Sequence, residues 1–241
     1  MKLEILYQDE HLVVLNKQPG ISVIPERFNQ QEACVQKLLE QQLGIKVYVV
    51  HRLDKETSGV LCFAKTEQAH KAISAQFQNH SVGKYYAAIL KGQLQPLEAR
   101  IERGIIEHPT QKGKMACSPK GKAAITDYKV VQQWPLYSLV QVQIHTGRTH
   151  QIRVHFASLG HPVLVDPLYG DARPFLLSSI KKGYKLSIQQ DEEQGVLKRL
   201  ALHAYRLDMI NMAQEPISIE APLPKDMRAC INQLDKQFKS K

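Results

Sequence analysis

The stretch HRLDKETSG, residues 51–59, lies between two short apolar runs at residues 47–50 and 60–64. Short apolar runs on either side of a turn that contains glycine are typical of β-strands. Asp54, a carboxylate between two cationic side chains, is therefore expected on a tight connection between strands, where a rigid scaffold presents a reactive group to solvent. The alternative is a loop aspartate that forms an Asx-turn and pairs with its neighbours.

Hydrophobic periodicity around this stretch predicts one α+β domain over residues 1–241, with a largely antiparallel sheet. Strands are predicted at residues 3–7, 12–16, 85–90, 99–106, 123–131 and 139–144. Helices are predicted at residues 32–43, from an N-cap at Thr66 to about residue 79, from an N-cap at Thr149 to Gly160, and after Pro224. Residues 173–198 carry mixed charge and are predicted to be an insertion or a mobile loop.

The composition, with 43% hydrophobic and 23% charged residues, is typical of a globular protein. No apolar run reaches the roughly 20 residues that a membrane-spanning helix needs. The N-terminus lacks the pattern of a signal peptide, so we expect a cytoplasmic protein. The four cysteines lack the CxxC spacing of a zinc site and suggest no disulfide framework.

The net charge of +9 favours a polyanionic partner. Residues 111–122 form a predicted loop that contains no acidic residue, and a second basic cluster surrounds Gly183. Basic loops suit contact with a phosphate backbone. The alternative is that both are solvated surface loops. Their lysines are Lys112, Lys114, Lys120 and Lys122 in the first segment and Lys181, Lys182 and Lys185 in the second.

Five segments, in order along the chain, resemble RluA-type pseudouridine synthases, which isomerise uridine in RNA to pseudouridine. HRLDKETSG is similar to the family motif HRLDxxTSG. The other segments are LVVLNKQPG at residues 12–20, KYYAA at residues 84–88, TGRTHQIRVH at residues 146–155 with its continuation to Gly170, and RLALHA at residues 199–204. Agreement of several motifs in order lowers the false-positive risk of each one.

The resemblance implies a mixed, mostly antiparallel sheet flanked by helices, with a central active-site cleft. It also implies a stand-alone catalytic domain, because the first family segment begins at Leu12 and leaves no room for the accessory N-terminal RNA-binding domain of many members. Two positions depart from the family pattern. Val165 stands where the family usually has glycine, which suggests a reshaped turn, and Gln18 separates a lysine and a proline that are adjacent in the family.

The resemblance assigns the catalytic roles to three residues. Asp54 is the expected nucleophile, because a carboxylate can form and release a covalent adduct; whether it attacks the sugar or the base is open. Tyr86 is expected to stack on the flipped uracil, with its hydroxyl available for proton transfer. Arg153 is expected to pair with Asp54 and offset the effect of burial on its pKa. The alternatives are that Arg153 is a surface arginine, or that Arg148 is the partner.

Further residues are expected to contact the substrate or the RNA. Arg52 would fill the space that the flipped base leaves or hold a flanking phosphate. Ile152 would pack under the uracil, and Arg148 would lie near the RNA backbone. The full predicted set of substrate-binding and RNA-binding residues is Arg52, Thr57, Arg148, Gln151, Ile152, Lys112 and Lys114.

No cofactor and no metal are expected, because the isomerisation needs neither a redox change nor phosphate energy. The five-residue spacing of His145, His150 and His155 does not match a zinc-binding helix face. Glu56 is taken as a surface residue and not as the second carboxylate of a glycosidase-like pair.

The predicted function is isomerisation of uridine in ribosomal or transfer RNA by a monomeric enzyme with no obligate protein partner. The alternatives are a non-catalytic RNA-binding or RNA-chaperone relative and, more remotely, a carboxylate-dependent nucleoside hydrolase.

Overall fold

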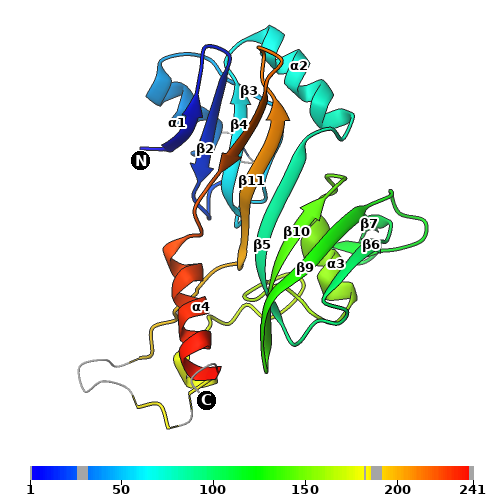
Figure 1. Ribbon diagram of the computed structural model, residues 1–241, viewed down its shortest axis with the longest axis vertical. Coiled ribbons are helices and arrows are strands. Elements are labelled where there is room, and N and C mark those ends of the chain that lie inside the picture. Colours follow the sequence, from blue (N-terminus) through cyan, green and yellow to red (C-terminus); the bar gives the residue numbers. More distant parts are fainter. Residues whose placement is uncertain (1, 26–31, 182, 186–191, 239–241) are drawn as a thin grey trace. The chain divides into compact units, whose positions relative to one another are not determined.

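The computed structural model describes residues 2–25, 32–181, 183–185 and 192–238 (Figure 1). The chain forms two compact units. The first contains residues 1–86, 143–146 and 203–222, and the second contains residues 87–142, 147–202 and 223–241. Each unit combines helices with mostly antiparallel strands, which confirms the predicted α+β class with a mixed, mostly antiparallel sheet. That the whole chain is a single domain stays a prediction.

In the first unit the strand order is β1-β2-β4-β11-β5, with β3 beside β4 and β12 beside β11. β2 pairs with β1 and β4 in antiparallel fashion, whereas β11 runs parallel to β4. The strands are β1 (Glu4–Gln8), β2 (Leu12–Lys17), β3 (Tyr48–Val49), β4 (Ser58–Ala64), β11 (Leu202–Ile210), β12 (Pro216–Glu220) and the first residues of β5 (Gly83–Lys91).

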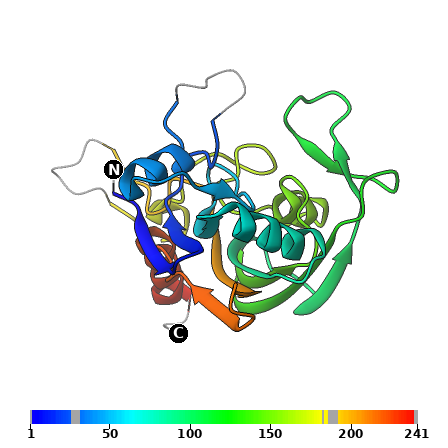
Figure 2. The same ribbon diagram turned by 90° about the horizontal axis from the view of Figure 1, so that it is seen from above.

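Helix α2 (Glu67–Gln78) packs against β3 and β4 (Figure 2). Its N-cap is Thr66, as predicted, and the side chain accepts a hydrogen bond from the Ala69 backbone N–H at 3.2 Å. The apolar face of α2 carries Ala69 and Ile73, which are fully buried against alternate residues of β2 and β4. The 3.6-residue period of the helix and the two-residue period of the strands therefore form one core.

Helix α1 (Val35–Leu43) ends at Gly44, which has a left-handed φ of 68°, as expected for a C-terminal glycine. The predicted start at residue 32 was wrong. The backbone N–H groups of Val35 and Gln36 donate to the carbonyls of Ser22 and Val23, so these residues form the first turn of the helix and residue 32 precedes it.

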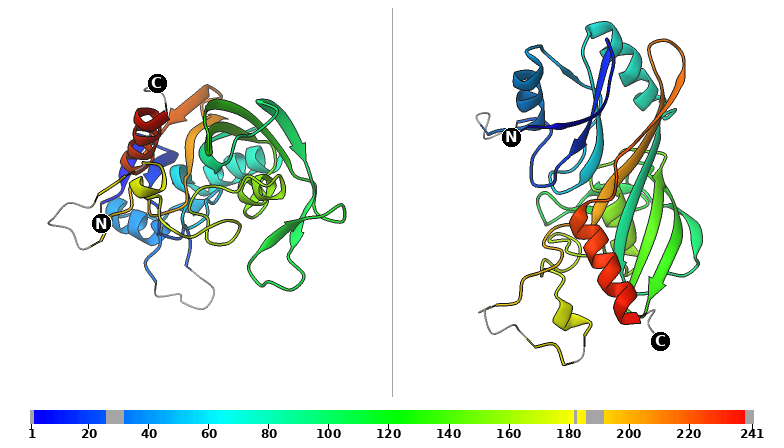
Figure 3. Two further views of the ribbon diagram at one scale, coloured as in Figure 1. Left: turned by 90° about the horizontal axis from the view of Figure 1, so that it is seen from below. Right: turned by 60° about the vertical axis from the view of Figure 1, so that its left-hand side comes forward.

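In the second unit the strand order is β5-β10-β9-β6, and β7 and β8 form a separate hairpin. The elements of this unit are the later residues of β5, β6 (Glu98–Glu102), β7 (Ile105–Glu107), β8 (Met115–Cys117), β9 (Ile125–Trp134), β10 (Tyr137–Ile144, its last two residues in the first unit), helices α3 (Gln151–Ser158) and α4 (Lys225–Phe238), and a short 3-10 turn, Leu177–Ser179. Helix α4 lies beside β9 (Figure 3).

The prediction of one strand over residues 99–106 was wrong, because the chain changes partner at Gly104. Strand β6 pairs with β9, and β7 pairs with β8. A Cβ at Gly104 would lie 2.6 Å from the carbonyl oxygen of Ser118 and 2.8 Å from that of Gly121, so the backbone passes too close for any side chain. Residues 111–122, predicted as a loop throughout, accordingly contain strand β8.

The predicted N-cap of α3 was also wrong: it is His150, with φ 55°, and not Thr149. The Gln151 side chain accepts a hydrogen bond from the Arg148 backbone N–H at 3.0 Å, and the Gln151 backbone N–H donates to the Arg148 carbonyl at 3.1 Å, so a closed turn from Arg148 to Gln151 precedes the helix.

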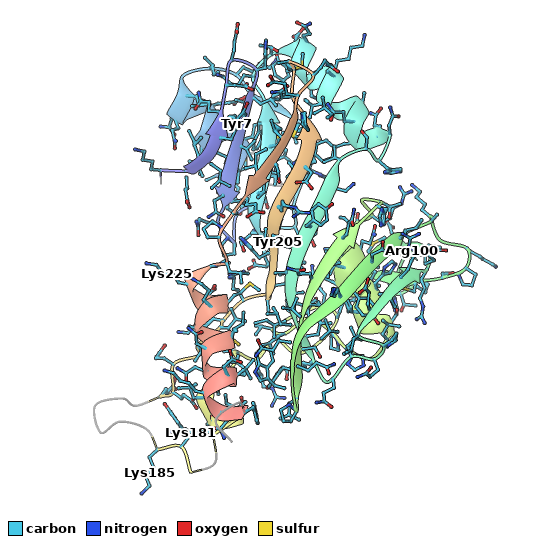
Figure 4. The ribbon with its side chains drawn as sticks, in the orientation of Figure 1. Tyr7, Arg100, Lys181, Lys185, Tyr205 and Lys225 are labelled. Carbon is cyan, nitrogen blue, oxygen red and sulfur yellow. The ribbon has the colours of Figure 1, made fainter. Side chains whose placement is uncertain are left out.

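The described parts of residues 173–198 are tied together near their ends. Phe175 and Leu197 pair through their backbones at 2.8 Å, and both side chains are buried. Lys181 and Lys185 are exposed between them, whereas Lys182 lies outside the described residues (Figure 4). That this segment is an insertion stays a prediction. Among the helices of the described residues, none is both long and apolar enough to cross a membrane.

Candidate active site

The loop that carries Asp54 connects β3 to β4 and is held by a buried lysine. Lys17, the last residue of β2, is 1% exposed. Its Nζ donates hydrogen bonds of 2.9 Å to three backbone carbonyls, those of Gln18, Lys55 and Thr57. The three N–H bonds of an ammonium group match these three acceptors. Two of the carbonyls lie one and three residues after Asp54, so Lys17 fixes the backbone that follows the expected nucleophile.

The backbone conformation and surroundings of Gly59 explain why the motif ends in glycine. Its φ is +114°, and a Cβ at this position would lie 2.0 Å from the carbonyl oxygen of Ala204. Gly59 is the second residue of strand β4, which runs parallel to β11 with Gly59 opposite Ala204. Only glycine allows both this conformation and this approach.

His51 acts as a structural acceptor at the start of the motif. Its Nε2 accepts the backbone N–H of Cys62 at 3.0 Å, and its ring stacks on Phe77 with the centroids 4.5 Å apart. Burial, together with the positive charge of Lys84, lowers the pKa of His51 to about 3. The imidazole is therefore neutral at physiological pH.

Tyr86 lies in the same unit as Asp54, on β5, and is 8% exposed. Burial raises the pKa of its hydroxyl, and the negative charge of Asp54 raises it further. The roles of Tyr86 and Asp54 in catalysis stay predictions. Tyr85 lies on the opposite face of the strand, where the guanidinium of Arg206 sits 3.9 Å from its ring centroid and Tyr205 of β11 lies beside it (Figure 4).

Two more residues of the motif were predicted to contact the substrate. Thr57 is 1% exposed, and its backbone N–H donates to the Asp54 carbonyl at 3.1 Å. Within the described part of the chain, no hydrogen-bond partner lies within reach of its hydroxyl. Arg52 is exposed. Both residues lie within three positions of Asp54, and their contacts with a substrate stay predictions. Glu56, expected at the surface, is partly buried.

Arg153 belongs to the second unit, where it forms a buried ion pair with Asp166. Its Nε and Nη2 donate to the two carboxylate oxygens at 2.8 Å, and the two side chains are 5% and 0% exposed. The backbone N–H groups of Leu168 and Tyr169 also donate to Asp166. Arg153 is thus no surface arginine. Its expected pairing with Asp54 joins residues of the two units and stays a prediction.

Val165, directly before Asp166, has a φ of 57°. It takes the left-handed conformation that a glycine adopts easily and a β-branched residue rarely does. The departure from the family pattern therefore leaves a strained valine in this turn.

The neighbours of Arg153 are buried too. Gln151 is 3% exposed and donates to the Ile125 carbonyl and the Thr126 hydroxyl, both at 2.9 Å. Ile152 is 4% exposed. Arg148, partly exposed, donates from Nε to the Ala123 carbonyl at 3.0 Å. Gln151 thus has a clear role in fixing the start of α3, and the substrate contacts of these three residues stay predictions.

Lys112 and Lys114 lie on the turn between β7 and β8. Lys112 is exposed, and the Nζ of Lys114 lies 5.6 Å from the ring centroid of Tyr169. The hydroxyl of Tyr169 accepts a hydrogen bond from the Met115 backbone N–H at 2.8 Å and lies 2.9 Å from Nδ1 of His150. The hairpin is therefore tied to the segment that follows Asp166.

The histidines of the second unit make contacts within the protein. The Nδ1 of His155 lies 2.9 Å from the Thr126 hydroxyl, and its Nε2 lies 3.0 Å from the Arg103 carbonyl. No group of three histidine, cysteine or acidic side chains within the described ranges could hold a metal ion.

The structural roles of three buried residues were not predicted from the sequence. Lys17 and Asp166 lie inside segments that resemble the family. Their spacing did not indicate that Lys17 would hold the Asp54 loop or that Asp166 would pair with Arg153. His203 stood in the last segment, and its Nδ1 lies 2.9 Å from the hydroxyl of Ser58 while its Nε2 lies 3.2 Å from the Ala221 carbonyl. All three are buried polar residues, and only the fold reveals their partners.

The chain was compared with known families and proteins. Residues 11–158 match the family model described as RNA pseudouridylate synthase. Ribosomal large subunit pseudouridine synthase D of Zymomonas mobilis is 35% identical, over 96% of this chain and 73% of its own length. An uncharacterized RNA pseudouridine synthase of Bacillus subtilis is 36% identical, over 95% of this chain and 75% of its own length. Ribosomal large subunit pseudouridine synthase D of Neisseria meningitidis serogroup B is 36% identical, over 94% of this chain and 60% of its own length.

Two solved human structures have the same fold. RNA Pseudouridylate Synthase Domain Containing 1 gives a TM-score of 0.75 at 25% identity, covering 100% of this chain and 96% of its own. RNA Pseudouridylate Synthase Domain Containing 4 gives a TM-score of 0.72 at 27% identity, covering 96% of this chain and 92% of its own. The chain therefore belongs to the RNA pseudouridylate synthase family, in its RluA type, and is an RNA pseudouridine synthase.

Proposed function

We propose that this enzyme isomerises uridine in ribosomal RNA, with Asp54 as the nucleophile. The observation that carries the proposal is the Asp54 loop itself: Lys17 fixes the backbone that follows the carboxylate through the Lys55 and Thr57 carbonyls. The charge of Asp54 also raises the pKa of Tyr86, which supports the proposal. Preorganisation of a reactive group by buried contacts is what catalysis requires. The names of the relatives from Zymomonas and Neisseria support RNA of the large ribosomal subunit as the substrate; transfer RNA is the alternative.

The reaction breaks the bond between N1 of uracil and C1′ of the ribose and forms a bond between C5 and C1′. The hydrogen on C5 is released, and N1 gains one, so the product is an isomer of the substrate. Asp54 forms a covalent adduct and is then released unchanged. The base must leave its stack to reach a buried tyrosine, and Arg52, exposed two residues before Asp54, is proposed to take up the vacated space.

Tyr86 is proposed to stack on the uracil ring. Because its pKa is raised, the hydroxyl keeps its proton throughout the neutral pH range, so it donates a hydrogen bond and does not act as a phenolate base. Arg153 is proposed, on the family resemblance, to orient the carboxylate of Asp54. The proposed enzyme acts as a monomer in the cytoplasm.

The test is to map pseudouridine in total RNA from cells with and without the gene, and to add back the wild type or the Asp54→Ala variant. The proposal expects a pseudouridine in ribosomal RNA to vanish without the gene and to return with the wild type alone. If the site returns equally with Asp54→Ala, Asp54 is not the nucleophile. If no site changes in any RNA, a non-catalytic RNA-binding role replaces the proposal; a site in transfer RNA alone corrects the substrate.

A further inference from the structure

Ser58, which directly follows the segment that Lys17 holds, makes a buried side-chain contact with β11. Its hydroxyl lies 2.9 Å from Nδ1 of His203. Nε2 of the same ring lies 3.2 Å from the carbonyl oxygen of Ala221, the residue after β12. Ser58 is 2% exposed and His203 is 0% exposed. All of these residues belong to the first unit, and the reaction proposed above uses neither side chain.

The direction of both hydrogen bonds follows from the acceptor at Ala221. A carbonyl oxygen can only accept, so Nε2 of His203 carries a proton and donates it. Burial disfavours a charged ring, and a neutral imidazole has one proton, so Nδ1 carries none. The Ser58 hydroxyl therefore donates to Nδ1. The two nitrogens of the ring thus have separate roles, one towards Ser58 and one towards Ala221.

The contact lies where two parallel strands meet. β4 and β11 pair with Ser58 opposite His203 and Gly59 opposite Ala204 (Figure 1). Gly59 allows this close approach, because a Cβ there would meet the Ala204 backbone. Ser58 is the first residue of β4, so its side chain ties the end of the strand nearest to the Asp54 loop to β11.

One short turn joins Ser58 to Asp54. The Thr57 backbone N–H donates to the Asp54 carbonyl at 3.1 Å, which closes a turn over residues 54–57. In the sheet β4 lies between β2 and β11. Lys17, at the end of β2, holds the Thr57 carbonyl, and His203, on β11, holds the next residue, Ser58. The turn that carries Asp54 is therefore held from both neighbouring strands.

A reactive carboxylate works well only when its position is held closely. A misplacement of about 1 Å, caused by a change away from the chemistry, can slow a reaction about 10²-fold. A serine side chain has three staggered rotamers, and the bond to Nδ1 selects one of them. The selected rotamer fixes the Ser58 backbone against β11, and with it the end of the turn.

We propose that Ser58 and His203 are positioning residues for the isomerisation, because the hydrogen bond from the Ser58 hydroxyl to Nδ1 of His203 holds the Asp54 turn in its reactive position. The inference rests on the proposed function, because that function makes Asp54 the nucleophile. Neither side chain touches the substrate.

The test measures kcat and KM for the release of tritium from ribosomal RNA that is labelled at C5 of uridine and comes from cells without the gene. Ser58→Ala removes only the hydroxyl. We expect kcat to fall about tenfold and KM to change less than about twofold, because the substrate contacts are kept. Adding His203→Gln to Ser58→Ala should lower kcat no further, because both changes remove the same interaction.

Two variants of His203 separate positioning from a merely structural role. His203→Asn places Oδ1 where Nδ1 stands, so it keeps the acceptor for Ser58 and loses the bond to Ala221. His203→Gln reaches the position of Nε2 and loses the acceptor for Ser58. We expect kcat to recover to within about threefold of the wild type in His203→Asn and to stay about tenfold lower in His203→Gln. In a merely structural role kcat would follow stability and not the atom that is kept.

Two controls lie on α2. Ile73→Val removes one methyl group from the core of the same unit, where Ile73 is 0% exposed. It should lower the midpoint of thermal unfolding and leave kcat unchanged. Lys71→Met, at an exposed position, should match the wild type throughout.

The outcomes separate the two proposals. If the wild type releases no label, or if Asp54→Asn releases it at the wild-type rate, the proposed function fails and this inference fails with it. If Asp54→Asn is inactive but Ser58→Ala keeps the wild-type kcat, the positioning role alone is refuted. Equal losses of kcat in His203→Asn and His203→Gln would also refute it. If the His203 variants do not fold, Ser58→Ala decides alone, and a Ser58→Ala protein that does not fold would show a structural role and overturn the inference.

Discussion

At the residue scale, the Asp54 loop depends on Lys17. Replacement by methionine keeps the buried stem but removes the ammonium donor from three carbonyls, of which that of Lys55 keeps the Gly20 backbone N–H. We expect Lys17→Met to lower the free energy of unfolding by about 3 kcal/mol and to reduce activity sharply, because the backbone around Asp54 loses its anchor. Chemical denaturation with an activity assay measures both effects. Lys71→Met is the matched control, and a Lys17→Met protein as stable and active as the wild type would contradict the role assigned to Lys17.

His51 predicts a pH dependence of stability. Its pKa is about 3 in the folded protein, against an ordinary value of 6.5. Between these values the unfolded chain binds a proton that the folded protein does not, so stability falls as the pH is lowered from about 6.5 towards 3, by about 1.4 kcal/mol per pH unit. Above pH 6.5 this residue contributes no slope.

The measurement is the free energy of unfolding between pH 7 and pH 5 for the wild type and His51→Gln, which keeps an acceptor for Cys62 and cannot titrate. The difference between the two proteins should shrink as the pH falls, because the wild type alone has this residue's slope. A difference that stays constant with pH would show that His51 titrates normally in the folded protein.

The roles of some residues could be predicted from the sequence, and those of others could not. Asp54 and Tyr86 stood in motifs whose chemistry is local, so their types and positions could be predicted. The roles of Lys17 and Asp166 could not, because each depends on partners that tertiary folding brings together. Thr149 illustrates the reverse case: a good capping residue stands one position before the observed N-cap, His150, because a turn closed between Arg148 and Gln151 precedes the helix.

At the element scale, the parallel contact between β4 and β11 depends on Gly59. We expect Gly59→Ala to destabilise the protein by more than about 3 kcal/mol, or to prevent folding. Two costs add: alanine disfavours a positive φ, and its Cβ would push β4 away from β11. Gly20→Ala is the control: its φ is +82°, but nothing lies within 4 Å of the added Cβ. It should cost only about 1 kcal/mol, for the conformation alone. Equal effects in thermal unfolding would refute the close approach.

Helix α3 and the segment that follows it are joined by the pair of Arg153 and Asp166. Asp166→Asn keeps the acceptor for the Leu168 and Tyr169 amides but leaves a buried guanidinium without this carboxylate. We expect a loss of about 3 to 5 kcal/mol in the free energy of unfolding. Asp127→Asn, which breaks the exposed pair with Arg100, should leave stability nearly unchanged. Similar losses in the two variants would show that the Arg153 pair is not buried.

Elements were predictable where the pattern was strictly local. The α2 helix, with its threonine cap and its apolar side, and the alternation of β10 are examples. The division of residues 99–106 between β6 and β7 was hidden, because it depends on how closely Gly104 approaches the backbone of Ser118 and Gly121. Hydrophobicity continues across that point although the pairing partner changes.

At the scale of the whole molecule, the family could be identified from five motifs in order, and the comparisons confirm it over most of the chain. The α+β class followed from the same patterns. The target uridine could not be predicted, since recognition of RNA depends on the shape of loops and splayed bases, which one protein sequence does not contain.

The most direct test of the account is the release of tritium from RNA labelled at C5 of uridine, because the new bond to the ribose displaces that hydrogen. The purified wild type should release label from ribosomal RNA of cells that lack the gene. Asp54→Asn, nearly equal in size, should bind the same RNA and release none. Release by Asp54→Asn at the wild-type rate would contradict the central claim, that Asp54 carries out the isomerisation.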